Sequence, residues 1–362
     1  MEWNLPGHAA AFFGLIGGVA LGAAARFGKF CTLAAIEDVL FGGNTWRWRM
    51  WVLAMAVAIG LTQLADSAGL IDIGQSFYVQ RPFNLLLLLV GGLMFGFGMA
   101  LVGTCAFGTV VRMGGGDLKF FVVFLVTGIS AYMAAAGPTA QLRVWLFDPF
   151  AATHPLLSDP RVDQILYALA GIPPWTVAAG VSMLLVAWVL SDRAFRGRRQ
   201  LLLWGIFVGA IIAFGWVATG WLSQDAFEPQ AVVSFSFVQP LGASVMYVMT
   251  SSGSTIGFGV GSVVGVLLGS GLAAVVRKEW RWEAADDAVE ARRQIIGGVL
   301  MGTGGMYALG CTIGQGLTAV SALTLSAPIV LAAIWFGAWL GLSYLLSGSV
   351  REWLGLLVMP RS

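Results

Sequence analysis

The sequence predicts an all-α polytopic membrane protein with about nine transmembrane helices. Of its 362 residues, 58% are apolar and 10% are charged, whereas a soluble domain is about a quarter charged. The apolar stretches are apolar on all sides, unlike the alternating strands of a transmembrane barrel, and helices satisfy every backbone polar group in lipid. A soluble enzyme does not fit this composition, and the net charge of +2 provides no strong field for nucleic acid.

Nine apolar stretches, taken in chain order, are the predicted spans. Most are long enough for a hydrocarbon core of about 30 Å, which takes about 20 helical residues. They cover residues 9–25, 50–64, 85–102, 120–136, 165–190, 201–222, 256–276, 295–309 and 325–346. Tryptophans flank several of these spans, as interfacial aromatic residues do: Trp46, Trp48, Trp51, Trp280 and Trp282.

Polar segments between the spans predict the orientation. Segments 192–199 and 277–293 are rich in arginine, so the positive-inside rule places both in the cytoplasm. Segment 148–163 has balanced charge and three prolines, and we expect it on the outer side as a linker. The N-terminus lacks a basic region followed by a cleavage site, so we expect no removable signal peptide.

An internal repeat surrounds every cysteine of the chain. The pattern Gly-Gly-x3-Gly-x8-Cys occurs three times and ends at Cys31, Cys105 and Cys311. These are the three cysteines that the sequence contains. A degenerate fourth copy ends at Ala218, where the thiol is missing. Repeats at a fixed register indicate a fold built from equivalent units.

The repeats predict a single membrane transport domain over residues 1–362. It consists of two pseudo-repeated halves, about 1–140 and 200–350, and each half holds two copies of the pattern. A linker and an extra helix, residues 141–199, join the halves. Repeated halves whose broken helices meet inside the membrane are typical of secondary transporters.

The glycines of the pattern permit two interpretations. Their Gly-x-x-x-Gly spacing lets helices pack closely in lipid. Further glycines crowd the cysteines, as a re-entrant segment requires, and non-helical backbone at that depth is tolerated where protein covers it or where it lines a wet cavity. These further glycines are Gly28, Gly103, Gly108, Gly310, Gly314 and Gly316.

The three thiols permit several chemistries. One possibility is that they are small apolar filling, but their identical placement in three repeats favours stations along a pathway. A metal site needs more ligands than these motifs contain, and disulfide chemistry needs a nearby cysteine pair; we expect no metal and no cofactor. A neutral thiol in apolar surroundings stays S–H and is a weak, polarizable donor, which suits a soft, sulfur-bearing anion.

Polar residues close to the cysteines support an anion. Lys29 and Arg26 precede Cys31, and Arg112 follows Cys105. An ionisable residue within a membrane is a functional candidate, although snorkelling to the interface is an equally ordinary role. Hydroxyl and amide groups add candidate donors, or bond to nearby backbone carbonyls instead: Thr104, Thr312 and Gln315.

Three sequence blocks resemble the YeeE/YedE sulfur-transport family of bacterial inner-membrane proteins. The blocks are FGKFC at 27–31, GTCAFG at 103–108 and GCTIGQG at 310–316. The resemblance implies a multi-pass inner-membrane permease, not an enzyme, that takes up a sulfur oxyanion such as thiosulfate. It also implies an inverted-repeat helical fold with short re-entrant helices, with Cys31, Cys105 and Cys311 along the pore. Family members often act with a small sulfur-carrier protein of the TusA type.

Two other classes of function stay open at this stage. A membrane thiol enzyme, such as a sulfurtransferase or disulfide exchanger, would carry sulfur covalently on one cysteine and would need a reactive thiolate. A structural membrane protein would use the cysteines as filling. The leading hypothesis is the permease, in which Lys29, Thr104, Thr312 and Gln315 accompany the three thiols in binding the anion.

Overall fold

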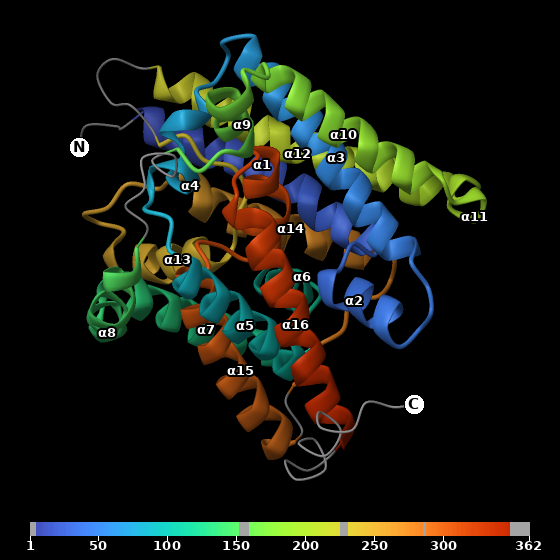
Figure 1. Ribbon diagram of the computed structural model, residues 1–362. Helices are drawn as coiled ribbons and strands as arrows, with labels where there is room; N and C mark the ends of the chain where they lie inside the picture. The colour runs from blue at the N-terminus through green and yellow to red at the C-terminus, as the bar shows by residue number, and fades with distance from the viewer. Residues whose placement is uncertain (1–4, 152–158, 225–230, 285–286, 348–362) are drawn as a thin grey trace.

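The computed structural model describes residues 5–151, 159–224, 231–284 and 287–347 (Figure 1). In these ranges the backbone is helical, and its β-type pairings are two isolated bridges, Asp117 with Glu283 and Arg161 with Thr324. The predicted all-α class is therefore confirmed. Part of the predicted outer linker, residues 152–158, lies outside the described residues.

The helices follow one another with short connections. In chain order they are α1 (Leu5–Phe27), α2 (Thr32–Leu40), α3 (Trp46–Ser67), η1 (Ile73–Gln75), α4 (Phe77–Gln80), α5 (Leu85–Val102), α6 (Ala106–Gly114), α7 (Lys119–Ala136), α8 (Pro138–Phe147), η2 (Asp148–Phe150), α9 (Val162–Ala170), α10 (Pro174–Leu190), α11 (Arg193–Arg196), α12 (Arg199–Ser223), α13 (Val238–Thr250), α14 (Phe258–Val276), α15 (Ala288–Tyr307), the π-helical turn η4 (Gly314–Ala319) and α16 (Ser326–Ser347).

Seven helical segments in the described part of the chain are long and apolar enough to cross a membrane. They are α1 with α2, α3, α5 with α6, α7, α12, α14 and α16. Helix α15 falls outside this group because its first turns carry Glu290, Arg292 and Arg293. The chain is thus a multi-pass membrane protein, while the expected number of nine spans is not confirmed.

The predicted span 165–190 is not one helix. Helix α9 ends at Gly171, which has a left-handed backbone (φ 68°), and α10 starts again at Pro174. Glycine adopts this conformation without strain, and proline is favoured in the first turn of a helix because it lacks the N–H that would stay unpaired there. The break leaves α10 with 17 residues.

The sequence predicted Trp51 at the membrane interface, but the structure buries this residue inside the protein. It is 1% exposed, and its ring stacks on Phe30 with the centroids 4.6 Å apart. Gly316 packs against the same indole. Because Phe30 directly precedes Cys31, the buried Trp51 supports the break between α1 and α2.

Close helix pairs connect the two parts of the sequence. Gly22 of α1 lies against the backbone of α14 at Val266 and Ser270, and Gly96 of α5 lies against α16 at Ile334 and Ala338. A Cβ atom at either glycine would meet backbone atoms closer than real Cβ contacts allow. The Gly-x-x-x-Gly spacing therefore serves helix packing, as one of its two interpretations held.

The helix pairs follow an inverted arrangement. Four pairs run parallel: α1 with α14, α3 with α12, α5 with α16 and α7 with α15. Helices α1 and α12 run antiparallel, and so do α5 and α15. Exchanging α1 with α12, α3 with α14, α5 with α15 and α7 with α16 reproduces the same pairs. A two-fold axis in the membrane plane produces this pattern; the boundaries near residues 140 and 200 stay a prediction.

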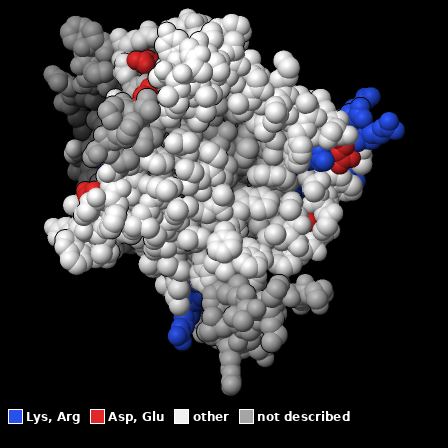
Figure 2. Space-filling model, in the orientation of Figure 1, with Lys and Arg blue, Asp and Glu red and all other residues white. Residues whose placement is uncertain are grey.

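Both basic segments lie at one end of the molecule. A cavity of about 730 Å³ is lined by Gln200 and Leu201, next to the first segment, and by Arg277 from the second. On the face shown in Figure 2, lysines and arginines gather over α11 and below α15, and the surface between is mostly uncharged. We call this the inner end of the molecule; the outer end, where α3 finishes, lies opposite.

We predict that Gly96→Ala destabilises the protein and that Gly180→Ala does not. The new methyl group at position 96 meets the backbone of α16, whereas Gly180, in the exposed part of α10, has open space around it. Overpacking costs about 1–3 kcal/mol, and alanine improves an exposed helix by about 1 kcal/mol. Thermal unfolding of both variants in detergent measures the difference; equal melting temperatures would contradict the packing role of Gly96.

Candidate functional site

Each cysteine stands at the start of a short helical segment. Cys31 precedes α2, Cys105 precedes α6, and Cys311 opens the turn that leads into η4. Before each cysteine a long helix ends: α1 at Phe27, α5 at Val102 and α15 at Tyr307. The structure therefore has the predicted helix breaks, and the repeat gives each break the same local form.

Cys105 and Cys311 share one local geometry. The Cys105 Sγ accepts a hydrogen bond from the backbone N–H of Gly108, and the Cys311 Sγ accepts one from Gly314, both with a distance of 3.4 Å. Gly103 ends α5 in a left-handed conformation (φ 81°), which glycine adopts without strain. Each thiol is thus held by its own short helix while its S–H proton is left to donate elsewhere.

An inner cavity brings Cys31 and Cys105 together. It has a volume of about 230 Å³, and Lys29 and Thr104 line it with the two thiols. Arg47 and Arg112 add two guanidinium groups to the lining, and no carboxylate lines it. The inner cavity is therefore lined by thiol, hydroxyl and cationic groups, and anion binding by Lys29 and Thr104 stays a prediction.

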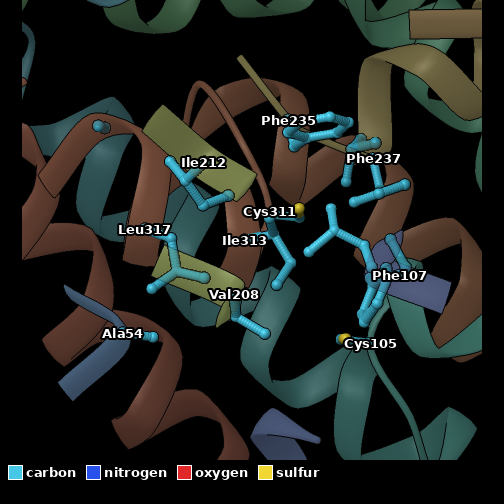
Figure 3. Close-up of a cluster of buried hydrophobic side chains, with 14 of the residues drawn as sticks. Ala54, Cys105, Phe107, Val208, Ile212, Phe235, Phe237, Cys311, Ile313 and Leu317 are labelled. Carbon is cyan, nitrogen blue, oxygen red and sulfur yellow. The ribbon is translucent and has the colours of Figure 1, made fainter. Parts of the chain in front are cut away.

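The Cys105 and Cys311 side chains lie in one buried cluster (Figure 3). Thr312 faces the Cys105 thiol without reaching hydrogen-bond geometry. Its hydroxyl has no hydrogen-bond partner among the described residues. The rings of Phe107 and Phe237 lie beside the thiols with centroids 4.9 Å apart. Cys105 and Cys311 are at most 1% exposed, so the structure is closed between them.

An outer cavity of about 240 Å³ lies beyond Cys311. Tyr78 and Ser236 line it, and their hydroxyl groups face each other. Both hydroxyls pack against Gly314, whose N–H holds the Cys311 thiol. Among the described residues, no charged side chain lines this cavity. The outer cavity thus offers hydroxyl groups immediately next to the third thiol.

Gln315 and Arg26 have structural partners. The Gln315 side-chain amide donates to the carbonyl oxygen of Ala308 at 2.7 Å, across the break between α15 and η4, and its own carbonyl oxygen has no partner in the described part. Arg26 donates to the carbonyl of Val111 and pairs with Glu279. Lys29, by contrast, forms no ion pair within the described residues and is exposed.

The degenerate fourth repeat, which ends at Ala218, has no helix break like those beside the three cysteines. Helix α12 continues through Ala218 to Ser223. Its neighbour Thr219 exchanges hydrogen bonds with Val233, accepting from its N–H at 3.1 Å, and so fixes the segment 231–236. That non-helical segment, and not the position of the lost thiol, supplies the polar group Ser236.

Sequence reasoning missed the outer residues Tyr78 and Ser236 and the aromatic pair Phe107 and Phe237. The sequence did carry one signal for Ser236 and Phe237. Residues 233–237 read Val-Ser-Phe-Ser-Phe, and alternation with period two indicates extended backbone. Tyr78 has no such signal, because α4 is only four residues long.

In the described part of the chain, no three His, Cys, Asp or Glu side chains gather closely enough to hold a metal ion. The fold of the chain and its two cavities, separated by a closed cluster of thiols and aromatic rings, define a multi-pass membrane transport protein. The chain matches the family described as "Sulphur transport" over residues 27–340 and belongs to that family.

Two curated relatives cover nearly the whole chain. The thiosulfate transporter TsuA of Spirochaeta thermophila is 27% identical over 338 residues, which is 90% of this chain and 96% of that protein. The thiosulfate transporter TsuA of Escherichia coli is 28% identical over 340 residues, 90% of this chain and 93% of that protein. The family and both names agree with the prediction of a transporter of sulfur compounds that is not an enzyme.

We predict that a thiol reagent modifies Cys31 at least about ten times faster than Cys105 and Cys311. Cys31 is partly exposed at the inner cavity, whereas the other two are buried, and a buried thiol reacts only when the structure opens. Mass spectrometry after timed treatment with N-ethylmaleimide measures all three rates in one sample. Denatured protein, in which the rates should converge, is the control; similar rates in the folded protein would contradict the closed state.

Proposed function

We propose that this protein is a bacterial inner-membrane permease that imports thiosulfate or a related sulfur-containing anion. The anion passes from the outer cavity to the inner cavity along the thiols of Cys311, Cys105 and Cys31. The observation that carries the proposal is the order of these groups: two cavities at opposite sides of one buried cluster, with a thiol at each step. The names of the two relatives support the choice of substrate.

The groups along this path match the two ends of thiosulfate. Its terminal sulfur is large and polarizable, and a neutral thiol is a weak, soft donor. Its oxygens accept hydrogen bonds from hydroxyl groups such as Tyr78 and Ser236 beside Cys311. Weak donors at several stations suit passage, because an anion must enter each station and leave it again.

Electrostatics give the path a direction. The described lining of the outer cavity is uncharged, and the inner cavity is lined by Lys29, Arg47 and Arg112. Asp38 pairs with Arg47 at 3.4 Å, which leaves the inner lining net positive. A positive lining at the inner end attracts an anion that has passed the buried thiols.

The buried cluster must open for the anion to pass. Phe107 and Phe237 pack beside the thiols, and the Thr312 hydroxyl there has no partner in the described structure. A buried hydroxyl without a hydrogen bond costs about 1–3 kcal/mol. We propose that the passing anion accepts a hydrogen bond from Thr312, so that its presence stabilises the open arrangement.

Replacing Cys105 or Cys311 by alanine should lower thiosulfate uptake at least about tenfold, because each change removes a donor from a narrow path. Serine at the same position should retain part of the activity, since a hydroxyl also donates. Growth on thiosulfate as the sole sulfur source, in cells that lack other importers, and uptake of labelled thiosulfate into vesicles measure the effect.

Wild-type uptake by both alanine variants, at equal expression, would contradict the pathway. Mass spectrometry of protein incubated with thiosulfate provides a second check. A persulfide on a cysteine during turnover would favour the thiol enzyme that the sequence left open. Unmodified thiols during active uptake agree with the permease.

Tyr78→Phe should raise the half-saturating concentration of thiosulfate about three- to tenfold, since it removes one hydrogen bond to the oxyanion. Maximal uptake should change less, because the phenyl ring still fills the same volume. The matched control is Tyr167→Phe, at a tyrosine that is 56% exposed and lies outside the cavity. Equal half-saturating concentrations for both variants would exclude Tyr78 from anion binding.

Two further parts of the proposal concern organisation. We infer that the two halves, about 1–140 and 200–350, act as the repeat units that move against each other around the buried cluster. We also propose a small sulfur-carrier protein of the TusA type as the acceptor in the cytoplasm. Co-purification of such a carrier with the permease, at the stoichiometry of a complex, tests the second part.

A further inference from the structure

The short helical segments of Cys105 and Cys311 end in turns of the same form. After α6, the turn that leads to α7 carries the isolated bridge of Asp117 with Glu283. After η4, the turn that leads to α16 carries the isolated bridge of Thr324 with Arg161. In both cases a distant segment outside the spans is attached to the return turn of a cysteine-bearing segment. We call these attachments the inner clip and the outer clip.

The outer clip is made of backbone hydrogen bonds. Val162 N–H donates to the carbonyl of Leu323, and Leu325 N–H donates to the carbonyl of Pro160, both at 2.8 Å. Leu323 has a left-handed backbone (φ 53°), which is uncommon for a leucine and costs free energy. The clip therefore holds the return turn of the Cys311 segment in a conformation that it would not keep alone.

The Arg161 side chain fixes the clip to the end of α3. Its Nε and Nη2 atoms donate to both carboxylate oxygens of Asp159, at 2.7–3.0 Å. Its Nη1 atom lies 3.9 Å from Asp66, in the last turns of α3. The Arg161 side chain is only 10% exposed, while Asp66 and Asp159 are 26% and 36% exposed. The bidentate geometry with Asp159, made by charged groups on both sides, is what makes this contact strong.

Asp66 continues the connection to the outer cavity. Its second carboxylate oxygen accepts a hydrogen bond from the Ile73 N–H at 3.1 Å, and Ile73 begins η1, directly before the helix α4 that carries Tyr78. One guanidinium group thus connects two segments: the return turn of the Cys311 segment through the clip, and the Tyr78 segment, which lines the outer cavity, through Asp66.

Carboxylates outnumber the arginine in this cluster. Asp66, Asp159 and Asp163 surround Arg161, and Asp72 faces Asp66. Asp163 is 1% exposed, and one of its carboxylate oxygens has no hydrogen-bond partner among the described residues. Burial raises the pKa of Asp163, although the positive charge of Arg161 opposes the rise. The cluster therefore takes up a proton more readily than separate aspartates would.

We propose that Arg161 is a positioning residue for the outer half of the pathway, and that protonation of its buried partner Asp163 strengthens the outer clip. This proposal deepens the proposed function, because the clip holds the segment that presents Cys311 to the outer cavity. The inner clip, which has no equivalent of Arg161 in its bridge, is independent of this device.

The direction of the pH effect follows from the raised pKa. A carboxyl whose pKa is higher in the closed clip than in the open one binds its proton more tightly when the clip is closed. The stabilisation of the closed clip by this proton is complete below the ordinary aspartate pKa of about 3.9. It is lost as the pH rises through the raised pKa. The outer clip is therefore firmest in an acidic exterior and loosens as the pH rises.

The rate at which a small methanethiosulfonate reagent modifies Cys311, relative to Cys31 in the same molecule, tests this proposal. The experiment uses the full chain in right-side-out membrane vesicles, with mass spectrometry as the readout. Arg161→Gln should raise the relative rate at least about tenfold, because it leaves buried carboxylates unpaired. Arg161→Lys, which keeps the charge and loses the bidentate contact, should lie between Arg161→Gln and the wild type.

The pH dependence of the Cys311 modification rate, relative to that of Cys31, separates a positioning role of Arg161 from a general loss of structure. In the wild type the relative rate should rise with external pH, and Asp163→Asn should flatten that rise. The matched control is Arg292→Gln, an exposed arginine at the inner end without an ion pair in the described residues; it should leave rate and profile unchanged. An unchanged relative rate in Arg161→Gln, or an unaltered profile in Asp163→Asn, would overturn the proposal.

The labelling readout is independent of the substrate. If thiosulfate uptake is absent but the Cys311 rate responds to Arg161 as expected, the proposed function fails and the positioning role stands. If uptake is normal and the Cys311 rate does not respond, the positioning role fails alone. Should Arg161→Gln not accumulate as folded protein, Arg161→Lys and Asp163→Asn decide the question by the same criteria.

Discussion

Non-helical backbone can lie within a membrane only where protein covers it, because lipid offers no hydrogen bonds. In this protein three long helices break beside a cysteine, at residues 28–31, 103–105 and 308–311. Close helix pairs surround the breaks, and their glycines bring backbones into direct contact. The thiols are inside the protein because the broken backbone that carries them has to be covered on all sides.

This constraint also explains the chemistry of the path. A site that is buried by packing contains mostly apolar side chains. Its polar groups are side chains located at the helix breaks, such as the hydroxyls of Thr104 and Thr312 and the thiols themselves. Among the described residues, the charged side chains that line the two cavities lie in the inner one, where Lys29 and Arg112 are exposed. The inverted pairing of helices places a cavity on each side of the same buried cluster.

The sequence predicted those parts that depend on composition and on the repeat. Most of the candidate spans followed from apolar length. The register of Gly-Gly-x3-Gly-x8-Cys identified the three breaks, two of which bring Cys31, Cys105, Lys29 and Thr104 to the inner cavity. Trp51 was assigned to the interface, since a sequence does not show that Phe30 stacks on its ring. The break in 165–190 had a local signal, Gly171 before two prolines, which the length of the apolar run concealed. Tyr78, Ser236 and the contact of Arg161 with Asp66 come from segments far apart in the chain, so no local pattern predicts them.

The most direct test of the account is a crystal structure of the protein soaked with selenosulfate, in which selenium takes the place of the terminal sulfur. Anomalous scattering locates that atom without reference to the rest of the ligand. The account predicts selenium peaks beside the thiols, in the outer cavity next to Cys311 and in the inner cavity between Cys31 and Cys105. Peaks confined to the protein surface, with both cavities empty at saturating ligand, would contradict it.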